Sequence, residues 1–470
     1  MSVGSLRLAL LCIALIASSS LSLASLAGAQ KPAAAHPKSA APATGLAKVC
    51  EDPYNGQKLQ TGWPEPPAYL LFKRANSKVW GPNLRIKLPG MQAAAPATAH
   101  TLVCVTEEQL EMGEYKSGAK AYTPSWDVYL LRLPDRAIYF QKGGIFGGNA
   151  PFVKWHPGAG VGSQPVSQLQ EWLRLVFKSD VARLKMRLPF TSPDKVRQIA
   201  FSGDGARLVV ARAPYHYSSP QTDLKKYPLV TIFDVASGKP VADIPVEDEP
   251  SAVAISENGE LVATEHYGHP QIWNVSSKSI VQKISADGVR WLAFGADGNL
   301  GVGMKERVAV FNPGTGSELF SSPGRRISYD NGRWIAVSAD GKTTYEVRSG
   351  QPIAHFPATE GEVVASADGQ SEITMSTSSS HVHWAGKEVE YVVMPSIGDS
   401  GTGRVSAIAS TPTGFAVGSN DAIVSLLSSS GNARLFATDH SQIEALAVTH
   451  DGKLLCVGDS SGKVSLWELQ

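Results

Sequence analysis

The last part of the chain, residues 443–469, reads IEALAVTHDGKLLCVGDSSGKVSLWEL. Three runs rich in apolar residues are separated by two short turns, Asp451-Gly452 and Ser460-Ser461-Gly462. Such runs, joined by turns that contain glycine, predict antiparallel strands connected as hairpins. Only three strands fit into this stretch. A fourth strand for the same sheet therefore has to come from elsewhere in the sequence.

The same turn marker recurs along the C-terminal part of the chain. Its seven copies each follow an apolar run, at Asp204-Gly205, Asn258-Gly259, Asp297-Gly298, Asn331-Gly332, Asp368-Gly369, Thr413-Gly414 and Asp451-Gly452. Successive copies are 54, 39, 34, 37, 45 and 38 positions apart. The two longest spacings contain a polar insertion at 214–228 and a Gly- and Ser-rich connection at 396–403. A period near ~40 residues with about four short strands per unit is typical of β-propeller blades.

Each unit also has a large apolar residue late in its third predicted strand. These residues are Phe233, Trp273, Phe311, Tyr345, Trp384, Leu426 and Trp467. Together with Ile232-Phe233-Asp234-Val235, Ile272-Trp273-Asn274-Val275 and Leu466-Trp467-Glu468-Leu469, this pattern resembles the WD-repeat (WD40-like) β-propeller family from residue 184 onward. The Gly-His pair that the family has between blades is absent, and Ser461 replaces its turn aspartate in the last unit. The resemblance implies an all-β fold, a seven-bladed β-propeller over residues 180–470.

The missing fourth strand is predicted just before the first repeat. Leu184, Met186 and Leu188 alternate with basic residues there, which is a strand pattern. We expect this strand to pair with the one that ends at Trp467, so that the N-terminal strand closes the propeller. Closure removes two sheet edges that would otherwise be open to association.

The N-terminal residues predict export. Arg7 precedes an apolar core at 8–16, and Ala27-Gly28-Ala29 has the form of a cleavage site, so residues 1–29 are interpreted as a secretory signal peptide. The core is too short to span a membrane, and no transmembrane segment is expected after cleavage. Residues 30–47, rich in Ala and Pro, are expected to form a disordered linker. The mature protein is expected to be secreted or periplasmic.

Residues 48–179 are interpreted as a small β-rich domain with one helix, of no recognised family. Strands are predicted at 84–88, 101–106, 126–133 and 137–141. The helix is expected to begin with a capping box formed by Ser167 and Gln170. Cys50 and Cys104 lie 54 positions apart, and an oxidising compartment would allow them to form a disulfide worth ~4 kcal/mol. Cys456 lies in an apolar run and is expected to be a buried free thiol.

Charge and motifs exclude several classes of function. The 43 Lys and Arg residues balance 42 Asp and Glu residues, so the chain lacks the basic surplus of a nucleic-acid binder. No nucleotide-binding, zinc-finger or EF-hand motif occurs, so no cofactor or metal site is expected. His381 and His383 fall on one face of a predicted strand, and His266 and His269 flank a turn. His381 and His383 are interpreted as part of a polar face rather than a metal site, because no third ligand is evident. His266 and His269 are interpreted as part of a solvated turn.

Two stretches have the form of serine-hydrolase motifs, Gly458-Asp459-Ser460-Ser461-Gly462 and Gly398-Asp399-Ser400-Gly401. The nucleophile elbow requires a strand-to-helix turn. Ser460 is predicted in a hairpin and Ser400 in a connection between units. No catalytic residue is therefore assigned, and the protein is not expected to be an enzyme.

The function expected from the resemblance is that of an exported, non-enzymatic scaffold that presents a rigid propeller face to a protein or peptide partner. The insertion at 214–228 supplies the aromatic and basic residues proposed to bind it: Tyr215, His216, Tyr217, Lys225, Lys226 and Tyr227. The alternative is an exported propeller enzyme, of the hydrolase, lactonase or quinone-dependent dehydrogenase type, with an unrecognised site at the channel mouth. Glu265 and Glu306 near strand ends are the carboxylates considered for such a site.

Overall fold

The structure is a computed structural model. It describes residues 44–51, 66–80, 86–87, 90–115, 117, 119–133, 138–146, 160–161, 164–177, 180–189, 194–213, 228–356, 362–366, 369–375, 380–384, 387–389, 405–420, 422–428, 433–438 and 442–470. The predicted signal peptide, 1–29, lies outside these residues, as does most of the predicted linker.

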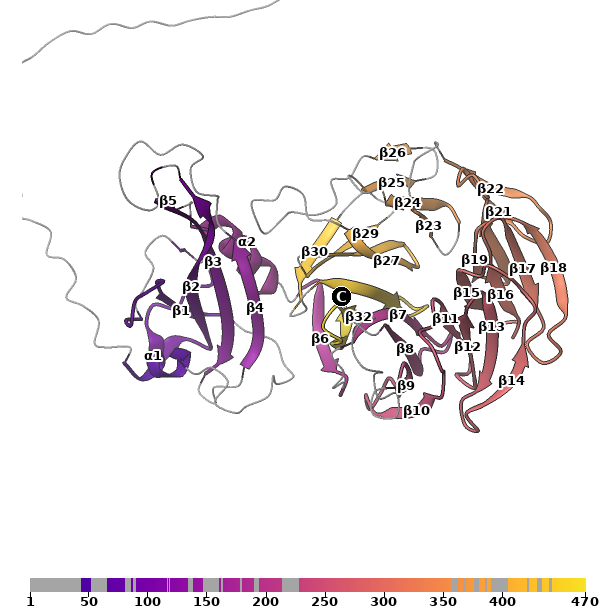
Figure 1. Ribbon diagram of the computed structural model, residues 1–470, viewed down its shortest axis with the longest axis horizontal. Coiled ribbons are helices and arrows are strands. Elements are labelled where there is room, and N and C mark those ends of the chain that lie inside the picture. Colours follow the sequence, from indigo (N-terminus) through magenta and orange to yellow (C-terminus); the bar gives the residue numbers. More distant parts are fainter. Residues whose placement is uncertain are drawn as a thin grey trace, which may run out of the picture. The chain divides into compact units, whose positions relative to one another are not determined.

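A five-stranded sheet forms the N-terminal part of the described chain (Figure 1). Its strands are β1 (Ala68–Lys73), β2 (Thr101–Glu114), β3 (Lys120–Arg132), β4 (Ile138–Phe146) and β5 (Gly160–Val161). They are arranged in the order β1-β2-β3-β4, and β5 pairs with the part of β3 that β4 leaves uncovered. The parallel partner of β2 is β1, which the strand predictions missed. The strand predicted at 84–88 is wrong at Ile86 and Lys87, which lie outside any strand.

Two α-helices accompany this sheet, where one was predicted. Helix α1 (Thr44–Glu51) begins inside the segment expected to be a disordered linker, so that prediction is wrong at 44–47. Helix α2 (Val166–Val176) begins after Pro165, without a side-chain cap. The predicted capping box is wrong because the helix starts one residue before Ser167. The Ser167 hydroxyl therefore bonds to Gln168, and the Gln170 amide donates to the Lys87 carbonyl at 2.6 Å.

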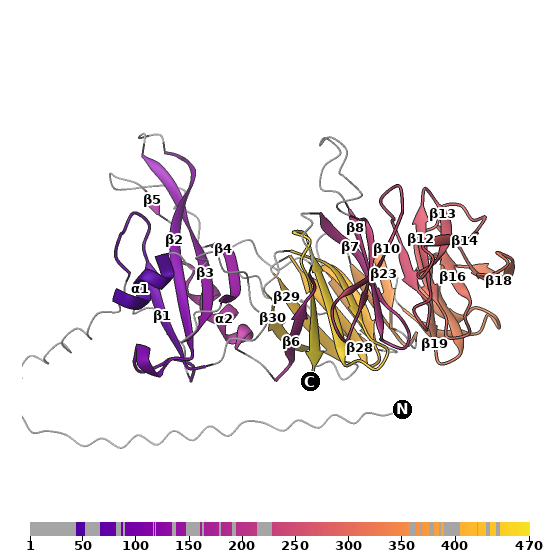
Figure 2. The same ribbon diagram turned by 90° about the horizontal axis from the view of Figure 1, so that it is seen from below.

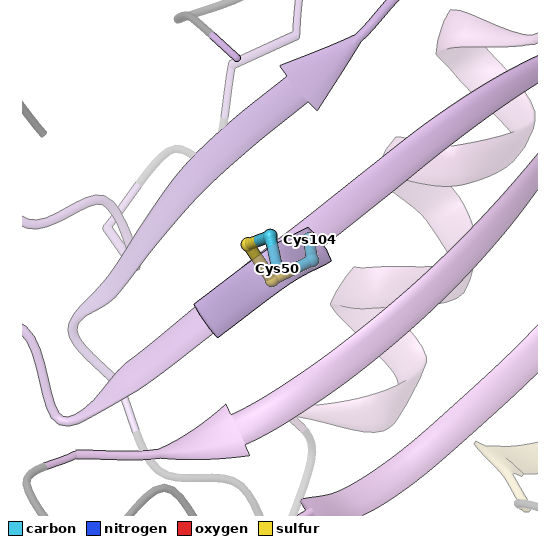
Figure 3. The surroundings of a disulfide bond; sticks show 2 residues. All are labelled: Cys50 and Cys104. Carbon is cyan, nitrogen blue, oxygen red and sulfur yellow. A yellow bond between two sulfur atoms is a disulfide. The ribbon is translucent and has the colours of Figure 1, made fainter. Parts of the chain in front are cut away.

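The disulfide between Cys50 and Cys104 ties α1 to β2 (Figure 3). Their Cα atoms lie 5.5 Å apart, within the usual range for a bridge. Around it, Val49 and both cysteines are buried with Leu71 and Leu102. This bridge explains why so short a helix is held in place, since isolated helices of this length are marginal in water. Cys456 is buried and free, as predicted.

The rest of the described chain is built from seven four-stranded antiparallel sheets (Figure 1). Six of them use consecutive strands, and the seventh borrows β6. The strands, sheet by sheet, are β7 (Lys195–Phe201), β8 (Arg207–Ala213), β9 (Val230–Asp234) and β10 (Pro240–Ile244); β11 (Val253–Ile255), β12 (Leu261–His266), β13 (His269–Asn274) and β14 (Ser279–Lys283); β15 (Trp291–Phe294), β16 (Leu300–Gly303), β17 (Arg307–Phe311) and β18 (Glu318–Pro323); β19 (Arg326–Asp330), β20 (Arg333–Val337), β21 (Thr343–Glu346) and β22 (Pro352–His355); β23 (Glu362–Ala365), β24 (Ser371–Met375), β25 (Ser380–Trp384) and β26 (Lys387–Val389); β27 (Val405–Thr411), β28 (Gly414–Ser419), β29 (Ile423–Ser428) and β30 (Ala433–Ala437); and β31 (Ile443–Val448), β32 (Leu454–Asp459), β33 (Val464–Leu469) and β6 (Ala182–Arg187).

The recurring turn connects the first and second strands of each sheet, as its sequence spacing predicted. In six copies the glycine has a left-handed backbone with φ between 70° and 82°, which side chains disfavour. In several sheets a hydroxyl completes the turn. At one of them, the Ser202 hydroxyl donates to the Asp204 carboxylate and accepts the Arg207 amide proton. All seven large apolar residues of the repeat fall on third strands.

Neighbouring sheets share buried apolar clusters. Ile232 of the first sheet shares a cluster with Trp273 of the second, and Ile272 of the second shares one with Leu300 of the third. Val310 of the third sheet shares a cluster with Trp334 of the fourth. Leu466 of the seventh sheet shares one with Val210 of the first. Ile373, Val417 and Leu455 belong to one cluster that includes the fifth, sixth and seventh sheets. Between the fourth and fifth, the Thr344 hydroxyl donates to the Gly369 carbonyl. Each sheet therefore contacts the next.

The strand predicted before the first repeat pairs with the C-terminal strand. In this antiparallel pairing of β6 with β33, Leu184 lies opposite Trp467 and Arg183 lies opposite Glu468. Trp467 is fully buried. Its indole nitrogen donates to the Ser465 hydroxyl at 2.7 Å. Residues almost 300 positions apart thus share one sheet, which the sequence pattern had predicted.

Candidate binding site

Residues in or near the first strands of the seven sheets line a cavity of about 1160 Å³. Six of these strands supply side chains to its wall, and Ser251, just before β11, represents the seventh. About half of the lining residues are aliphatic, such as Ala200, Ala407 and Ala445, and the others are mostly polar or charged. A cavity of this size, lined by both aliphatic and charged side chains, is large enough to hold a ligand.

Charged side chains gather on one part of the cavity wall. We call the set Arg290, Trp291, Lys305, Arg325 and Arg326 the basic rim. Arg290 and Lys305 are exposed, whereas the other three are half-buried. The guanidinium carbon of Arg326 lies 3.5 Å from the centroid of the Trp291 ring. This cation–π contact holds one cation in a fixed position.

The backbone brings these residues together from the third and fourth sheets. Arg290 and Trp291 stand at the start of β15, and Arg325 and Arg326 at the start of β19. The Arg290 amide donates to the Gly303 carbonyl at 2.8 Å. A Cβ atom at Gly303 would lie only 3.0 Å from both the Arg325 oxygen and the Trp291 Cβ, so a side chain there would require its neighbours to shift.

The charge of the cavity wall is uneven. In the basic rim, four cations face one lining carboxylate, Glu306, whose side chain is 77% exposed and lies 3.9 Å from Lys305. On the side formed by β7 and β31, Arg197 is paired with Glu249 at 3.9 Å. Burial raises the pKa of Glu444 there, and Lys195 and Arg197 oppose that shift. Among the lining residues, cations therefore outnumber carboxylates in the basic rim.

A tight turn between β12 and β13 lies beside the loop that leads to Arg290. Tyr267, at the tip of this turn, is 84% exposed and has a φ of 51°, a conformation that is rare for an aromatic residue. The buried carboxylate of Glu265 holds the turn by accepting from the Ser251 hydroxyl and the Gly268 amide. Glu265 is therefore a structural residue here. A Cβ atom at Gly268 would lie 2.9 Å from the Gly288 nitrogen, two residues before Arg290.

Histidines near this turn differ in their environment. His266 is buried, its Nε2 lies 3.1 Å from the Thr264 hydroxyl, and burial lowers its pKa. The interpretation of His266 as solvated surface is therefore wrong, whereas His269 is exposed and lies 3.5 Å from Asp287. His381 and His383 occupy alternate positions of β25, opposite Thr374 and Glu372. Within the described part of the chain, no group of three or more potential metal ligands lies together.

The other predicted site residues have different outcomes. All six residues proposed to bind a partner lie outside the described residues: Tyr215, His216, Tyr217, Lys225, Lys226 and Tyr227. The segment around Ser400 does too. Ser460 lies in the hairpin turn between β32 and β33, as predicted, and the Asp459 carboxylate holds this turn by accepting from the Ser461 and Lys463 amides. Neither α1 nor α2, the helices of the described chain, has the length and apolar run that a membrane crossing needs.

The basic rim was missed in the sequence, although a signal for it is present. A basic residue directly precedes the first strand of both the third and the fourth unit, in Arg290-Trp291 and Arg325-Arg326. Equivalent positions of a repeat lie side by side when the units stack, so basic residues at the same position in neighbouring units indicate a shared patch.

No protein-family model matches the chain, and no curated protein is detectably similar to it.

Proposed function

We propose that this protein is an exported, non-enzymatic binding protein of the WD-repeat-like type, in which the seven sheets form a closed propeller. Its basic rim binds an acidic segment of a protein or peptide partner. The observation that carries the proposal is the group of four cations on the wall of a large cavity, one of them fixed on the face of Trp291.

The chemistry of the rim favours carboxylate ligands. Arginine guanidinium groups form paired hydrogen bonds with carboxylates, and such charge-assisted bonds are about twice as strong as neutral ones. Four like charges in one patch repel each other, so an anionic ligand relieves that repulsion as well as adding contacts. The exposed ring of Tyr267, next to the same loop, offers the kind of rigid aromatic contact that is common in partner-binding surfaces.

Selection from a random peptide library on the immobilised protein tests this proposal. We expect the selected peptides to be enriched in Asp and Glu. Replacement of both Arg290 and Arg326 by Gln should weaken their binding at least ~150-fold, since each charge-assisted bond contributes about 1.5–3 kcal/mol. Binding should also weaken as salt is added.

The matched control is the double replacement Lys278→Gln and Lys283→Gln. Both lysines are exposed, one on β14 and one just before it, away from the cavity lining. This control removes the same total charge from the protein. Equal binding by the rim variant and the wild type, or selected peptides without acidic residues, would contradict the proposal.

A further inference from the structure

The hairpin formed by β2 and β3 extends well beyond β1 and β4 (Figure 2). On one side of β2, the parallel pairing with β1 covers Thr101–Thr106 and ends with Lys73 opposite Thr106. From that point β2 continues for eight residues to Glu114, which is about 27 Å of strand at the usual rise per residue. We call this part of β2, residues 107–114, the free edge.

The two outer edges of the hairpin differ in how much of their length is paired with a neighbouring strand. On the β3 side, β4 covers the strand as far as Ser125, and β5 pairs with Ala121 and Tyr122 beyond it. On the β2 side, no described residue pairs with the backbone of the free edge. An edge of this kind presents a row of backbone amide and carbonyl groups that a further strand can join.

The side chains of the free edge are unusual for a surface strand. Leu110 is 38% exposed and Met112 is 60% exposed, although both are large and apolar. Glu108 alternates with Leu110 on one face of the strand, whereas Glu107 and Glu111 point to the opposite face. Met112 lies where the pairing of β2 with β3 shifts register, between Glu111 and Gly113. Glu107 is partly buried, where it accepts hydrogen bonds from the side chains of Trp126 and Gln164.

The charge of this region is negative. Residues 107–120 contain four glutamates and two lysines, and Lys120 is already paired with Glu111 and Glu114 at 2.5 Å and 3.6 Å. A second copy of the chain would be a poor partner. Pairing of two free edges would bring the four glutamates of one copy beside the four of the other, and like charges opposite each other destabilise a strand pair.

We propose that the free edge binds an extended segment of another protein, in which apolar residues alternate with Lys or Arg. The segment joins the sheet as a strand beside β2. Its apolar side chains cover Leu110 and Met112, and its basic side chains face the glutamates on the opposite face. This inference is independent of the basic rim, because the two surfaces have opposite charge and lie on different sheets.

Fluorescence anisotropy with the full chain tests this proposal. The probe is a labelled peptide of seven alternating Val and Lys residues, and the comparison peptide has Glu in place of Lys. We expect the basic peptide to bind and the acidic peptide not to bind. Hydrogen exchange with the basic peptide present should slow at amides in 107–114.

The informative variant replaces Leu110 and Met112 by Lys. Both side chains are exposed, so the fold is expected to be retained, and peptide affinity should fall at least ~10-fold. The matched control is Val79→Lys, because Val79 is 74% exposed in the same part of the chain but lies outside the free edge. The basic-rim variant should bind the peptide as the wild type does.

Three results would overturn the proposal. The first is equal binding of the two peptides, and the second is equal affinity of the Leu110/Met112 variant and the wild type. The third is reversible self-association of the wild-type chain in sedimentation that disappears in the variant, since that result assigns the edge to a second copy.

Discussion

Replacement of Trp467 by Ala perturbs the sheet that joins the two ends of the repeat region. The side chain is fully buried, lies opposite Leu184 of β6, and contacts the ring of Phe436 with a centroid distance of 5.2 Å. A buried tryptophan covers roughly 200 Å², which at ~25 cal/mol per Å² corresponds to about 5 kcal/mol. Measured Trp-to-Ala changes in cores cost about 3–5 kcal/mol. The lost hydrogen bond to Ser465 adds about 1 kcal/mol.

Urea unfolding followed by far-UV circular dichroism measures this cost. The matched control is Trp291→Ala, which removes the same group from a half-buried position on the cavity wall. We expect Trp467→Ala to lower the unfolding midpoint clearly more than the control does. Equal shifts for the two variants would refute the inference that β33 and β6 form a tightly packed sheet.

Two further predictions concern local stabilisation. Replacement of Cys50 and Cys104 by Ser should lower the stability of the N-terminal sheet by ~4 kcal/mol, because the bridge closes a loop with a sequence separation of 54. Hydrogen exchange at the amides of β2 measures this loss of stability. Unchanged exchange rates in the variant would contradict the prediction. Hydrogen bonds from the Thr449 hydroxyl and the Lys453 amide lower the pKa of Asp451 to about 2. Because this pKa lies below the ordinary 3.8, the carboxylate stabilises the folded state above about pH 4, and that contribution is lost as the pH falls toward 2. Asp451→Asn should therefore be less stable than the wild type at pH 7 and equal to it near pH 2; a difference that does not change with pH would be inconsistent with this explanation.

The repeat region was largely predictable because its signals are local and recur. Strand alternation, turn glycines such as Gly452 and third-strand residues such as Trp467 lie at a regular spacing, so each copy supports the interpretation of the others. The pairing of β6 with β33 was predictable from two observations. The last repeat has sequence for only three strands, and apolar residues alternate with basic ones around Leu184.

The N-terminal sheet and its helices were less predictable because long-range contacts decide their local structure. Helix α1 lies in Ala-rich sequence that resembles a linker, and it is held by packing around Cys50 rather than by its own propensity. The strand β1 is a short apolar run, which periodicity alone does not distinguish from a helix.

The candidate site was the least predictable part. The cations of the basic rim come from two units, and no motif connects Arg290 with Arg326 along the chain. They meet only because the third and fourth sheets pack against each other, so their proximity is a property of the fold.

A cross-strand disulfide tests most directly whether the ends of the repeat region share one sheet. Arg183 and Glu468 are opposite each other in β6 and β33, and opposite residues of an antiparallel pair have Cα atoms about 4.5–5.5 Å apart, within bridging range. The chain with Arg183→Cys and Glu468→Cys should form an intramolecular 183–468 bridge, detected by mass spectrometry of non-reduced peptides. The control pairs Arg183→Cys with Lys463→Cys, five positions away and ~17 Å along the strand. A 183–468 bridge no more frequent than the 183–463 bridge, or one formed only between two molecules, would contradict the account.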